Sequence, residues 1–178
     1  FVIAAPTICL GQAIPSLTKN NVKTVIVSSS KPIERQLVTE NTIYEIRNTI
    51  NLEGKTIFVP PHCEIIFKSG GVISNGTVVG DKTLIIGQLT GVLDGVSIQG
   101  SFINKKISSG IFKHHPQLSS LINLVGGGGI IDLNSDIEHD GSAIPLLKSI
   151  TIDGIGHTIN IQSEGIKSGF LFEINEAD

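Results

Sequence analysis

Three short stretches, Gly54–Val59 (GKTIFV), Gly76–Gly80 (GTVVG) and Gly95–Gly100 (GVSIQG), decide the fold of this 178-residue chain. Each stretch opens with a glycine that permits a tight turn and continues as a short apolar strand. The opening glycines are 22 and 19 residues apart. A strand that recurs about every 20 residues is typical of a solenoid, in which each repeat forms one coil and contacts only its neighbours.

The side chains within these strands alternate as a solenoid requires. Ile57 and Val59 are expected to face the interior, and so are Ile65 and Phe67, because successive side chains of a strand point to opposite sides. The charged residues beside them then face solvent. Stacked coils place like residues above one another, which explains why 30 residues of the chain are isoleucine.

Further strands are expected along most of the chain. They are Thr24–Ser28, Ile43–Arg47, Glu64–Lys68, Thr83–Ile86, Ile130–Leu133, Ser149–Ile152, His157–Ile161 and Gly169–Ile174. One segment differs, because the apolar residues at 118, 121, 122 and 125 have the spacing of a short amphipathic helix. We therefore predict an all-β solenoid with one short helix near residues 116–125, which the glycine run Gly126–Gly129 ends.

The chain divides into three parts on this basis. Residues 1–13 have the apolar run and the small residues at Gly11 and Ala13 that are typical of the end of a secretory signal peptide. The alternative is an ordinary strand with a turn at Pro6. Residues 14–112 form the first β-helix segment, and residues 113–178 form the helix and further coils. Because an uncovered coil edge templates further pairing, the parent protein is expected to continue beyond the C-terminus.

Composition excludes several classes of protein. The net charge is -3 and no basic cluster is present, so nucleic acid is not expected as a partner. No stretch of 18 apolar residues could cross a membrane. The two cysteines, Cys9 and Cys63, are too few for a disulfide framework, and Cys63 is expected to be a small buried residue.

Two blocks of the sequence resemble a known superfamily. The first runs from Asn51 to Gly80, and the second joins Leu121–Gly129 to Lys148–Ile159. Both are similar to the opening coils of right-handed parallel β-helix proteins of the pectin-lyase-like superfamily. The resemblance implies a right-handed parallel β-helix and an extracellular protein that contacts polysaccharide. It implies little about chemistry, because turn glycines and stacked apolar residues build coils and catalyse nothing.

No catalytic residue can be transferred from the superfamily. Its pectate lyases use carboxylates to hold Ca²⁺ and an arginine as base, but the two arginines here, Arg35 and Arg47, precede the repeated coils. The polygalacturonase motifs are missing, and Gly156-His157-Thr158 only approaches one of them. His157 is therefore interpreted as a turn residue beside a strand.

Two other features invite a functional interpretation. The adjacent His114 and His115 point to opposite sides in an extended segment, so they do not easily share a metal ion. The run Gly126–Gly129 follows a helix and precedes a strand, which is the reverse of the order in a phosphate-binding loop. Both features are interpreted as structural.

The best candidate for a ligand site is an acidic stretch between residues 132 and 140. Its oxygen-bearing side chains fall at every second position: Asp132, Asn134, Asp136, Glu138 and Asp140. In an extended chain all five lie on one side and could hold Ca²⁺, which prefers such hard oxygen ligands. The spacing departs from an EF-hand at Ile137 and Ala143, so the alternative is the solvent face of a coil with Leu133 and Ile137 inward.

Two functions follow from these observations. The first is an extracellular β-helix module, non-catalytic in itself, that presents a rigid surface for polysaccharide binding or for attachment to a cell surface or within a phage tail. The second is the N-terminal part of a polysaccharide lyase or glycoside hydrolase whose catalytic coils lie beyond residue 178. Both place the protein outside the cell or on its surface.

Overall fold

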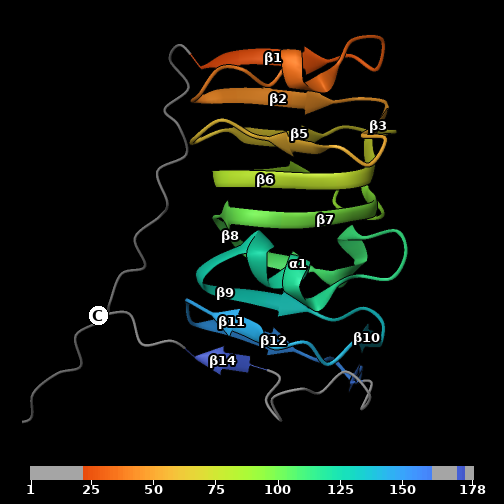
Figure 1. Cartoon of the computed structure of the whole chain (residues 1–178), viewed down its shortest axis with the longest axis vertical. Coiled ribbons are helices and arrows are strands. Elements are labelled where there is room, and N and C mark those ends of the chain that lie inside the picture. Colours follow the sequence, from red (N-terminus) through yellow and green to blue (C-terminus); the bar gives the residue numbers. More distant parts are fainter. Residues whose placement is uncertain (1–21, 162–171, 175–178) are drawn as a thin grey trace, which may run out of the picture.

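The computed structural model of the protein describes residues 22–161 and 172–174. The described chain winds into a parallel β-solenoid of about 7 turns, with one coil stacked on the next (Figure 1). This architecture confirms the predicted parallel β-helix fold. The strands are β1 (Lys23–Val27), β2 (Thr42–Ile46), β3 (Thr49–Asn51), β4 (Thr56–Phe58), β5 (Glu64–Phe67), β6 (Val72–Gly87), β7 (Leu93–Phe102), β8 (Asn104–Ser108), β9 (Val125–Asp132), β10 (Ile137–His139), β11 (Ile144–Leu146), β12 (Ile150–Asp153), β13 (Ile159–Ile161) and β14 (Phe172–Ile174).

The first coils form two faces of parallel strands, and the long strand β6 runs from one face to the other. On one face β1, β2, β5 and the end of β6 lie in register, so that Tyr44, Ile65 and Ile85 stack. On the other face β3 and β4 pair with β6, and β6 pairs with β7. The three segments that decided the fold therefore stack as predicted.

The core is a set of aliphatic ladders along the axis. Ile57, Val78 and Ile98 stack on consecutive coils and are all buried. The predicted inward positions Ile65 and Phe67 are buried as well. A fully buried isoleucine contributes about 2–3 kcal/mol, and its β-branch suits the extended backbone of a strand. One connected cluster of such residues runs through the described coils.

The observed register of β4, β6 and β7 differs by one residue from the predicted register, as the turns before these strands show. Thr56 pairs with Thr77, and Thr77 pairs with Ser97, so the turn position is shared by Gly54, Asn75 and Gly95. All three of these turn residues have positive φ, at 78°, 53° and 61°. Asparagine adopts this conformation more readily than other side chains do. The sequence alignment placed Gly76 at the turn position of Gly54 and Gly95. In the structure Asn75 occupies this position, because its backbone has the same left-handed conformation.

The one α-helix among the described residues, α1 (Leu118–Leu124), lies beside β7 at the place of a strand. Two of its side chains bond to the backbone of β7 that a further strand would pair. The Ile98 N–H donates to Ser120 Oγ (3.0 Å), and Asn123 Nδ2 donates to the Ile98 carbonyl (2.8 Å). The helix thus confirms the prediction near residues 116–125 and replaces one strand of the stack. It is too short to cross a membrane, and so is every other helix among the described residues.

The glycine run follows α1 closely, but it does not stand between the helix and the next strand, as was predicted. It lies within β9, where Asn104 pairs with Val125 but Lys106 pairs with Ile130. Four glycines therefore face a single residue of β8, Lys105, and form a wide bulge. Beyond the bulge β9 pairs with β12, which extends the solenoid.

The last coils are held by shorter ladders. β10 pairs with β13, and β11 pairs with β14. Of the predicted strands, Ser149–Ile152 corresponds to β12 and His157–Ile161 to β13, although His157 itself lies in a turn. The predicted strand Gly169–Ile174 is described only at Phe172–Ile174. The predicted signal segment, residues 1–13, lies outside the described residues. Two 3-10 turns, η1 (Ile33–Arg35) and η2 (Ser109–Ile111), complete the elements.

Candidate functional site

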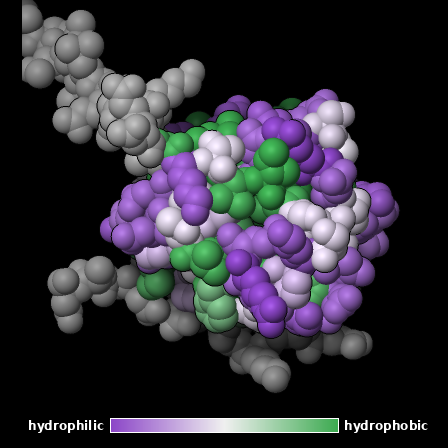
Figure 2. Space-filling model, turned by 90° about the horizontal axis from the view of Figure 1, so that it is seen from above, coloured by the Kyte–Doolittle hydropathy of each residue, from purple (hydrophilic) through white to green (hydrophobic). Residues whose placement is uncertain are grey.

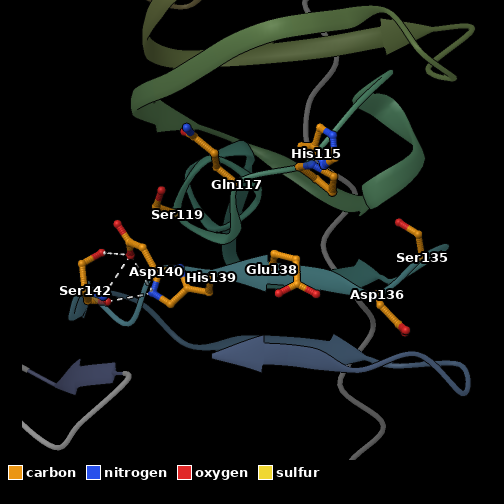
Figure 3. Close-up of a pocket in the computed structure, with 10 residues that line it drawn as sticks. His115, Gln117, Ser119, Ser135, Asp136, Glu138, His139, Asp140 and Ser142 are labelled. Carbon is orange, nitrogen blue, oxygen red and sulfur yellow. Dashed lines mark hydrogen bonds and ion pairs between the residues drawn. The ribbon is translucent and has the colours of Figure 1, made fainter. Parts of the chain in front are cut away.

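A polar groove of about 720 Å³ opens between the segment that leads into α1 and the coil that contains β10. Figure 3 shows its residues from both walls. The α1 wall is formed by His115, Pro116, Gln117 and Ser119, and the β10 wall by Ser135, Asp136, Glu138, His139, Asp140 and Ser142. None of these residues is Lys or Arg, so the groove is acidic.

The α1 wall is fixed by the way the helix begins. Gln117 occupies the N-cap position, and its carbonyl accepts the N–H of Leu121 (3.0 Å). Its side-chain Oε1 accepts hydrogen bonds from Ser97 on β7 and from Ser120 on the helix, both at 3.3 Å. His115 precedes this cap with φ at 42°. The amide and hydroxyl groups of this wall therefore belong to a rigid helix start.

The β10 wall carries three carboxylates, each held by a different partner. Asp136 Oδ1 accepts the backbone N–H of Thr158 (2.9 Å) and lies 3.5 Å from His157 Nδ1. Glu138 Oε1 accepts the side-chain amide of Asn160 (2.9 Å), its register partner on β13. Asp140 Oδ1 accepts both the hydroxyl (2.6 Å) and the backbone N–H (2.9 Å) of Ser142.

These hydrogen bonds set the charge of the groove. The backbone N–H of Thr158, and then His157, lower the pKa of Asp136 below its ordinary value. The Ser142 hydroxyl and N–H lower the pKa of Asp140 in the same way. Both groups are therefore deprotonated at neutral pH, where they accept hydrogen bonds and cannot donate a proton.

One histidine anchors the β10 wall from the inside. The side chain of His139 is only 8% exposed, and its Nε2 donates to the carbonyl of Ser142 (2.8 Å). Because a carbonyl oxygen can only accept, Nε2 carries a proton in this hydrogen bond. Because Ser142 also bonds Asp140, the segment from 139 to 142 is one tight turn.

The structure separates the five residues that were predicted to hold Ca²⁺. Asp136, Glu138 and Asp140 line the groove, as described above. Asp132 lies at the end of β9, where its Oδ2 pairs with Lys106 (2.7 Å) and its buried Oδ1 has no partner among the described residues. Asn134 accepts the hydroxyl of Ser108.

The reason for this separation is a bend at residues 134 and 135 between β9 and β10. The expectation that all five side chains lie on one side rested on an extended chain, and this premise is wrong. Leu133 and Ile137 are nevertheless buried, as the solvent-face alternative predicted. Within residues 22–161 and 172–174, no group of three or more His, Cys, Asp or Glu side chains is placed to hold a metal ion. Calcium binding by Asp132, Asn134, Asp136, Glu138 and Asp140 stays a prediction.

The other residues that the sequence singled out have ordinary surroundings. His114 lies 3.2 Å from Asp94, and together with Lys113 it lowers the pKa of that carboxyl. Cys63 is buried as predicted, and burial raises the pKa of its thiol. Lys148, which the sequence did not single out, donates to the carbonyl of Val125, and burial lowers the pKa of its ammonium group.

Sequence reasoning missed most of the α1 wall. Gln117 and Ser119 carry no motif, and only the helix start brings them opposite the carboxylates. Ser142 could have been found, because a serine two residues after Asp140 is typical of a turn closed by the aspartate side chain. His139 was not singled out, since alternation gives no sign that its ring anchors the turn.

Comparison of the chain with protein-family models, with curated proteins and with solved structures found no match.

Proposed function

We propose that the protein is an extracellular or cell-surface β-helix module that binds polysaccharide in the acidic groove and does not itself cleave it. The observation that carries this proposal is the composition of the groove, which sets fixed carboxylates opposite the amide and hydroxyl groups of the α1 wall. Carboxylates make strong, charge-assisted hydrogen bonds with hydroxyl donors. A sugar presents many such hydroxyls, and a rigid stack of coils suits an extended glycan chain.

The charge of the groove favours some glycans over others. Asp136, Glu138 and Asp140 face it, and no cation among its lining residues offsets them. A polyuronate would bring further carboxylates into a negative field, which costs free energy. We therefore propose neutral glycans or glycans with amino groups as ligands. The resemblance to pectin-lyase-like proteins would have suggested pectin instead.

The enzyme alternative receives less support from the same groove. Glycoside hydrolysis needs a carboxylic acid whose pKa is raised, so that it can protonate the leaving group. The pKa values of Asp136 and Asp140 are lowered, not raised. A parent enzyme with catalytic coils beyond residue 178 is the second candidate. Reducing-sugar assays and assays for unsaturated products on a panel of glycans test it directly, since turnover by this chain would contradict the non-catalytic proposal.

The binding proposal is tested by calorimetry with three probes of different charge: a neutral β-glucan oligosaccharide, a chitosan oligosaccharide and an oligogalacturonate. We expect binding of the neutral or the amino-sugar probe and none of the oligogalacturonate. Glu138→Ala removes a groove carboxylate and should weaken binding about tenfold, which corresponds to about 1.4 kcal/mol.

Glu53→Ala is the matched control, because Glu53 is an exposed glutamate that does not line the groove. It should leave the affinity unchanged. Equal affinities of the two variants would place glycan binding elsewhere, and failure of all three probes to bind would overturn the proposal for these glycan classes.

A further inference from the structure

The end of the solenoid that carries β1 presents a groove whose lining contains cations but no acid. Among the described strands β1 is the last of the stack at this end and pairs only with β2 (Figure 1). The groove has a volume of about 450 Å³. We call this surface the basic end; its residues are Lys23, Val25, Ile26, Lys31, Pro32, Arg35, Gln36, Val38 and Thr39.

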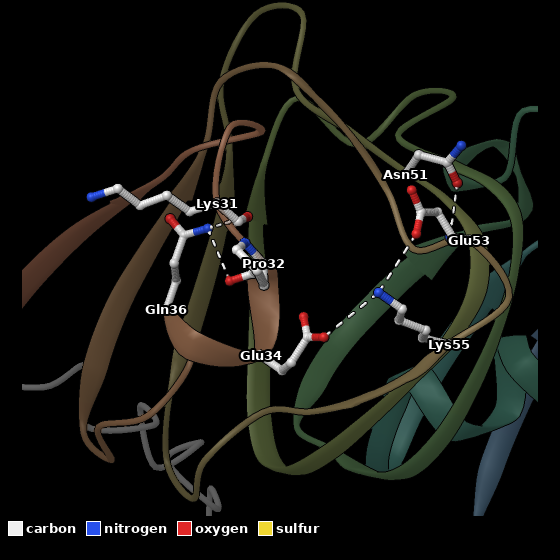
Figure 4. Close-up of polar contacts among 7 residues, drawn as sticks. All are labelled: Lys31, Pro32, Glu34, Gln36, Asn51, Glu53 and Lys55. Atoms are coloured by element: carbon white, nitrogen blue, oxygen red, sulfur yellow. Dashed lines mark hydrogen bonds and ion pairs between the residues drawn. The ribbon is translucent and has the colours of Figure 1, made fainter.

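The cations of the basic end lack carboxylate partners. They are Lys23, Lys31 and Arg35. None of them forms an ion pair among the described residues. The acid of the η1 turn, Glu34, pairs instead with Lys55, at 3.7 Å (Figure 4), and Glu40 does not line the groove. The positive charge of the basic end is therefore not offset by acids of its own lining.

The loop that carries two of these cations is held rigidly. Gln36 clamps it: its Oε1 accepts the Ser28 N–H (2.8 Å), and its Nε2 donates to the carbonyls of Ser28 (2.9 Å) and Lys31 (3.0 Å). Ile33, in the same loop, is buried in the core. The backbone that carries Lys31 and Arg35 is thus fixed before any ligand arrives.

Two exposed aliphatic side chains lie on the same surface. Ile26 is 52% exposed and Val38 is 67% exposed. Val38 cannot turn inward, because the neighbouring Leu37 is buried in the core. On its other side, the N–H and the carbonyl of Thr39 both bond the Tyr44 hydroxyl, at 2.9 and 2.7 Å. In Figure 2, which views the molecule from this end, apolar residues gather within a hydrophilic rim.

The combination of cations and apolar groups discriminates among ligands. A soluble polyanion would neutralise the cations but leave Ile26 and Val38 in water. An apolar segment of protein would cover Ile26 and Val38 but desolvate the cations without a counter-charge, which costs free energy. Residues 1–22 contain one lysine and no acid, so they cannot supply that counter-charge.

An anionic lipid surface meets both requirements. Apolar side chains enter the boundary between the headgroups and the acyl chains of a bilayer. Lysine and arginine keep their charged tips in the headgroup layer, and each contributes to binding when the lipids are anionic.

We propose that the basic end docks the protein onto an anionic lipid surface, with its exposed apolar side chains inserted at the interface and its three cations among the headgroups. The axis of the solenoid then points away from the surface. Several coils, each about 4.8 Å thick, separate the basic end from the acidic groove. Because physiological salt screens charges beyond about 8 Å, the surface does not repel the groove carboxylates. The proposal does not rest on glycan binding by the groove.

Flotation with lipid vesicles tests the proposal on the full chain. We expect the protein to float with vesicles of phosphatidylcholine that contain about 30% phosphatidylglycerol and not with phosphatidylcholine alone, because the cations need anionic headgroups. Binding should fall as NaCl is raised from about 50 mM to about 500 mM, since salt screens the attraction. A wild type that does not bind the anionic vesicles at low salt would overturn the proposal.

Charge reversal locates the binding surface. Lys31→Glu with Arg35→Glu should weaken binding to the anionic vesicles at least tenfold. The control, Lys82→Glu with Lys105→Glu, changes the net charge equally at two exposed cations elsewhere and should weaken binding less than about twofold. Equal losses in the two variants would mean that the net charge alone attracts the protein, which contradicts a docking role of the basic end.

A second pair of variants tests the apolar contact. Val38→Ser should weaken binding to the anionic vesicles about fivefold, because less apolar surface then leaves water. Leu147→Ser is the matched control, since Leu147 is a similarly exposed aliphatic residue (77%) that does not line the basic end. It should bind as the wild type does. If Val38→Ser did so too, the cations would act without insertion, as in a site for soluble polyanions, and the proposal would be wrong.

Two further measurements separate the lipid surface from other partners. Inorganic phosphate should displace the protein from the vesicles no better than NaCl of the same ionic strength, and stronger displacement would assign the cations to free phosphate. Sedimentation velocity without lipid should show no association that depends on Lys31 and Arg35, since such association would assign the basic end to a second copy. Either result would contradict the proposal. None of these measurements involves a glycan, so their outcome is independent of the groove.

Discussion

Two neighbouring levels of the solenoid differ in how the backbone N–H and C=O groups of a strand edge find hydrogen-bond partners. In the stack of β4, β6 and β7, each backbone pairs with the backbone of the next strand. One level further, α1 takes the place of a strand, and the side chains of Ser120 and Asn123 bond to Ile98 instead. A similar substitution occurs where Asn104 bonds both backbone groups of Ile85. A coil can therefore be irregular if side chains supply the missing donor and acceptor.

The comparison also shows what the two levels tolerate. The regular stack brings glycine backbones into close contact, as where Gly80 pairs with Gly100. At the irregular level, Gly127 and Gly128 in the middle of the bulge have open space around them, whereas a Cβ at Gly129 would lie 2.8 Å from Val125 Cβ. Regularity thus restricts side-chain size at the corners, whereas the middle of the bulge does not.

The largest effect is expected from placing the same side chain at a glycine of each level. A Cβ at Gly100 would lie 2.1 Å from the Gly80 carbonyl oxygen, and its φ of 79° adds strain. A Cβ at Gly127 would meet nothing within 4 Å. Gly100→Ala should therefore cost about 3–4 kcal/mol, and Gly127→Ala should stay within about 0.5 kcal/mol. Urea unfolding followed by circular dichroism measures both, and equal losses would show that the bulge is as tightly packed as the stack.

The next effect concerns Asn104, which is 5% exposed. Asn104→Leu keeps the volume but leaves the Ile85 N–H and carbonyl without partners, which should cost about 2–3 kcal/mol. Asn48→Leu is the control, because Asn48 is exposed and its side chain has no hydrogen bond among the described residues. Near-ultraviolet circular dichroism of the buried Tyr44 reports unfolding in both variants. If the two variants were equally stable, the bridge at Ile85 would be dispensable.

A smaller effect is expected at two adjacent serines of α1, which test whether the helix replaces the hydrogen bonds of a strand. Ser120 is 1% exposed and accepts the Ile98 N–H, whereas Ser119 is exposed. Ser120→Ala should lower the free energy of unfolding by about 1–2 kcal/mol, and Ser119→Ala should change it by less than about 0.5 kcal/mol. Hydrogen exchange of the Ile98 amide gives an independent measurement. It should accelerate only in Ser120→Ala, and unchanged exchange would mean that the helix does not substitute for a strand.

The regular level was predictable from sequence, whereas the irregular level was not. Alternation located Ile57 and Val59 correctly because strand periodicity is local. The one-residue register error arose because Asn75 shares the left-handed turn conformation with glycine, which letter identity cannot show. The bulge of the glycine run depends on the pairing of β9 with β8, a contact between residues far apart in sequence.

In the candidate site, too, local alternation could be predicted from the sequence and contacts between distant residues could not. Alternation placed Asp136, Glu138 and Asp140 on one surface, and the structure keeps these three together in the groove. Asp132 and Asn134 were lost from the set because a bend interrupts the extended chain. The α1 wall could not be predicted, since Gln117 and Ser119 meet the carboxylates only through the stacking of coils.

The smallest effect is expected at two carboxylates with lowered pKa values, Glu45 in the first coils and Asp136 in the last coils. The Arg47 side chain, which donates to Glu45 (2.9 Å from Nε), and then Lys68 hold the pKa of Glu45 below its ordinary value. Asp136 owes its lowered pKa first to the backbone N–H of Thr158. In both cases the carboxylate stabilises the folded state above its unfolded pKa, and this contribution is lost as the pH falls through the folded pKa.

The two groups should differ in their response to salt. The lowered pKa of Glu45 depends on the charged, exposed side chains of Arg47 and Lys68. Glu45→Gln should therefore lower the free energy of unfolding by less than about 1 kcal/mol at pH 7, and raising NaCl should reduce this loss. Asp136→Asn should lower the stability by an amount that salt changes little, because the backbone N–H of Thr158 carries no net charge. Both differences should shrink between pH 5 and pH 3, since protonation removes the wild-type advantage. Melting curves at two salt concentrations and three pH values test this. Equal salt dependence would mean that the charge of Asp136 is stabilised by His157, 3.5 Å away, and not by the backbone N–H of Thr158.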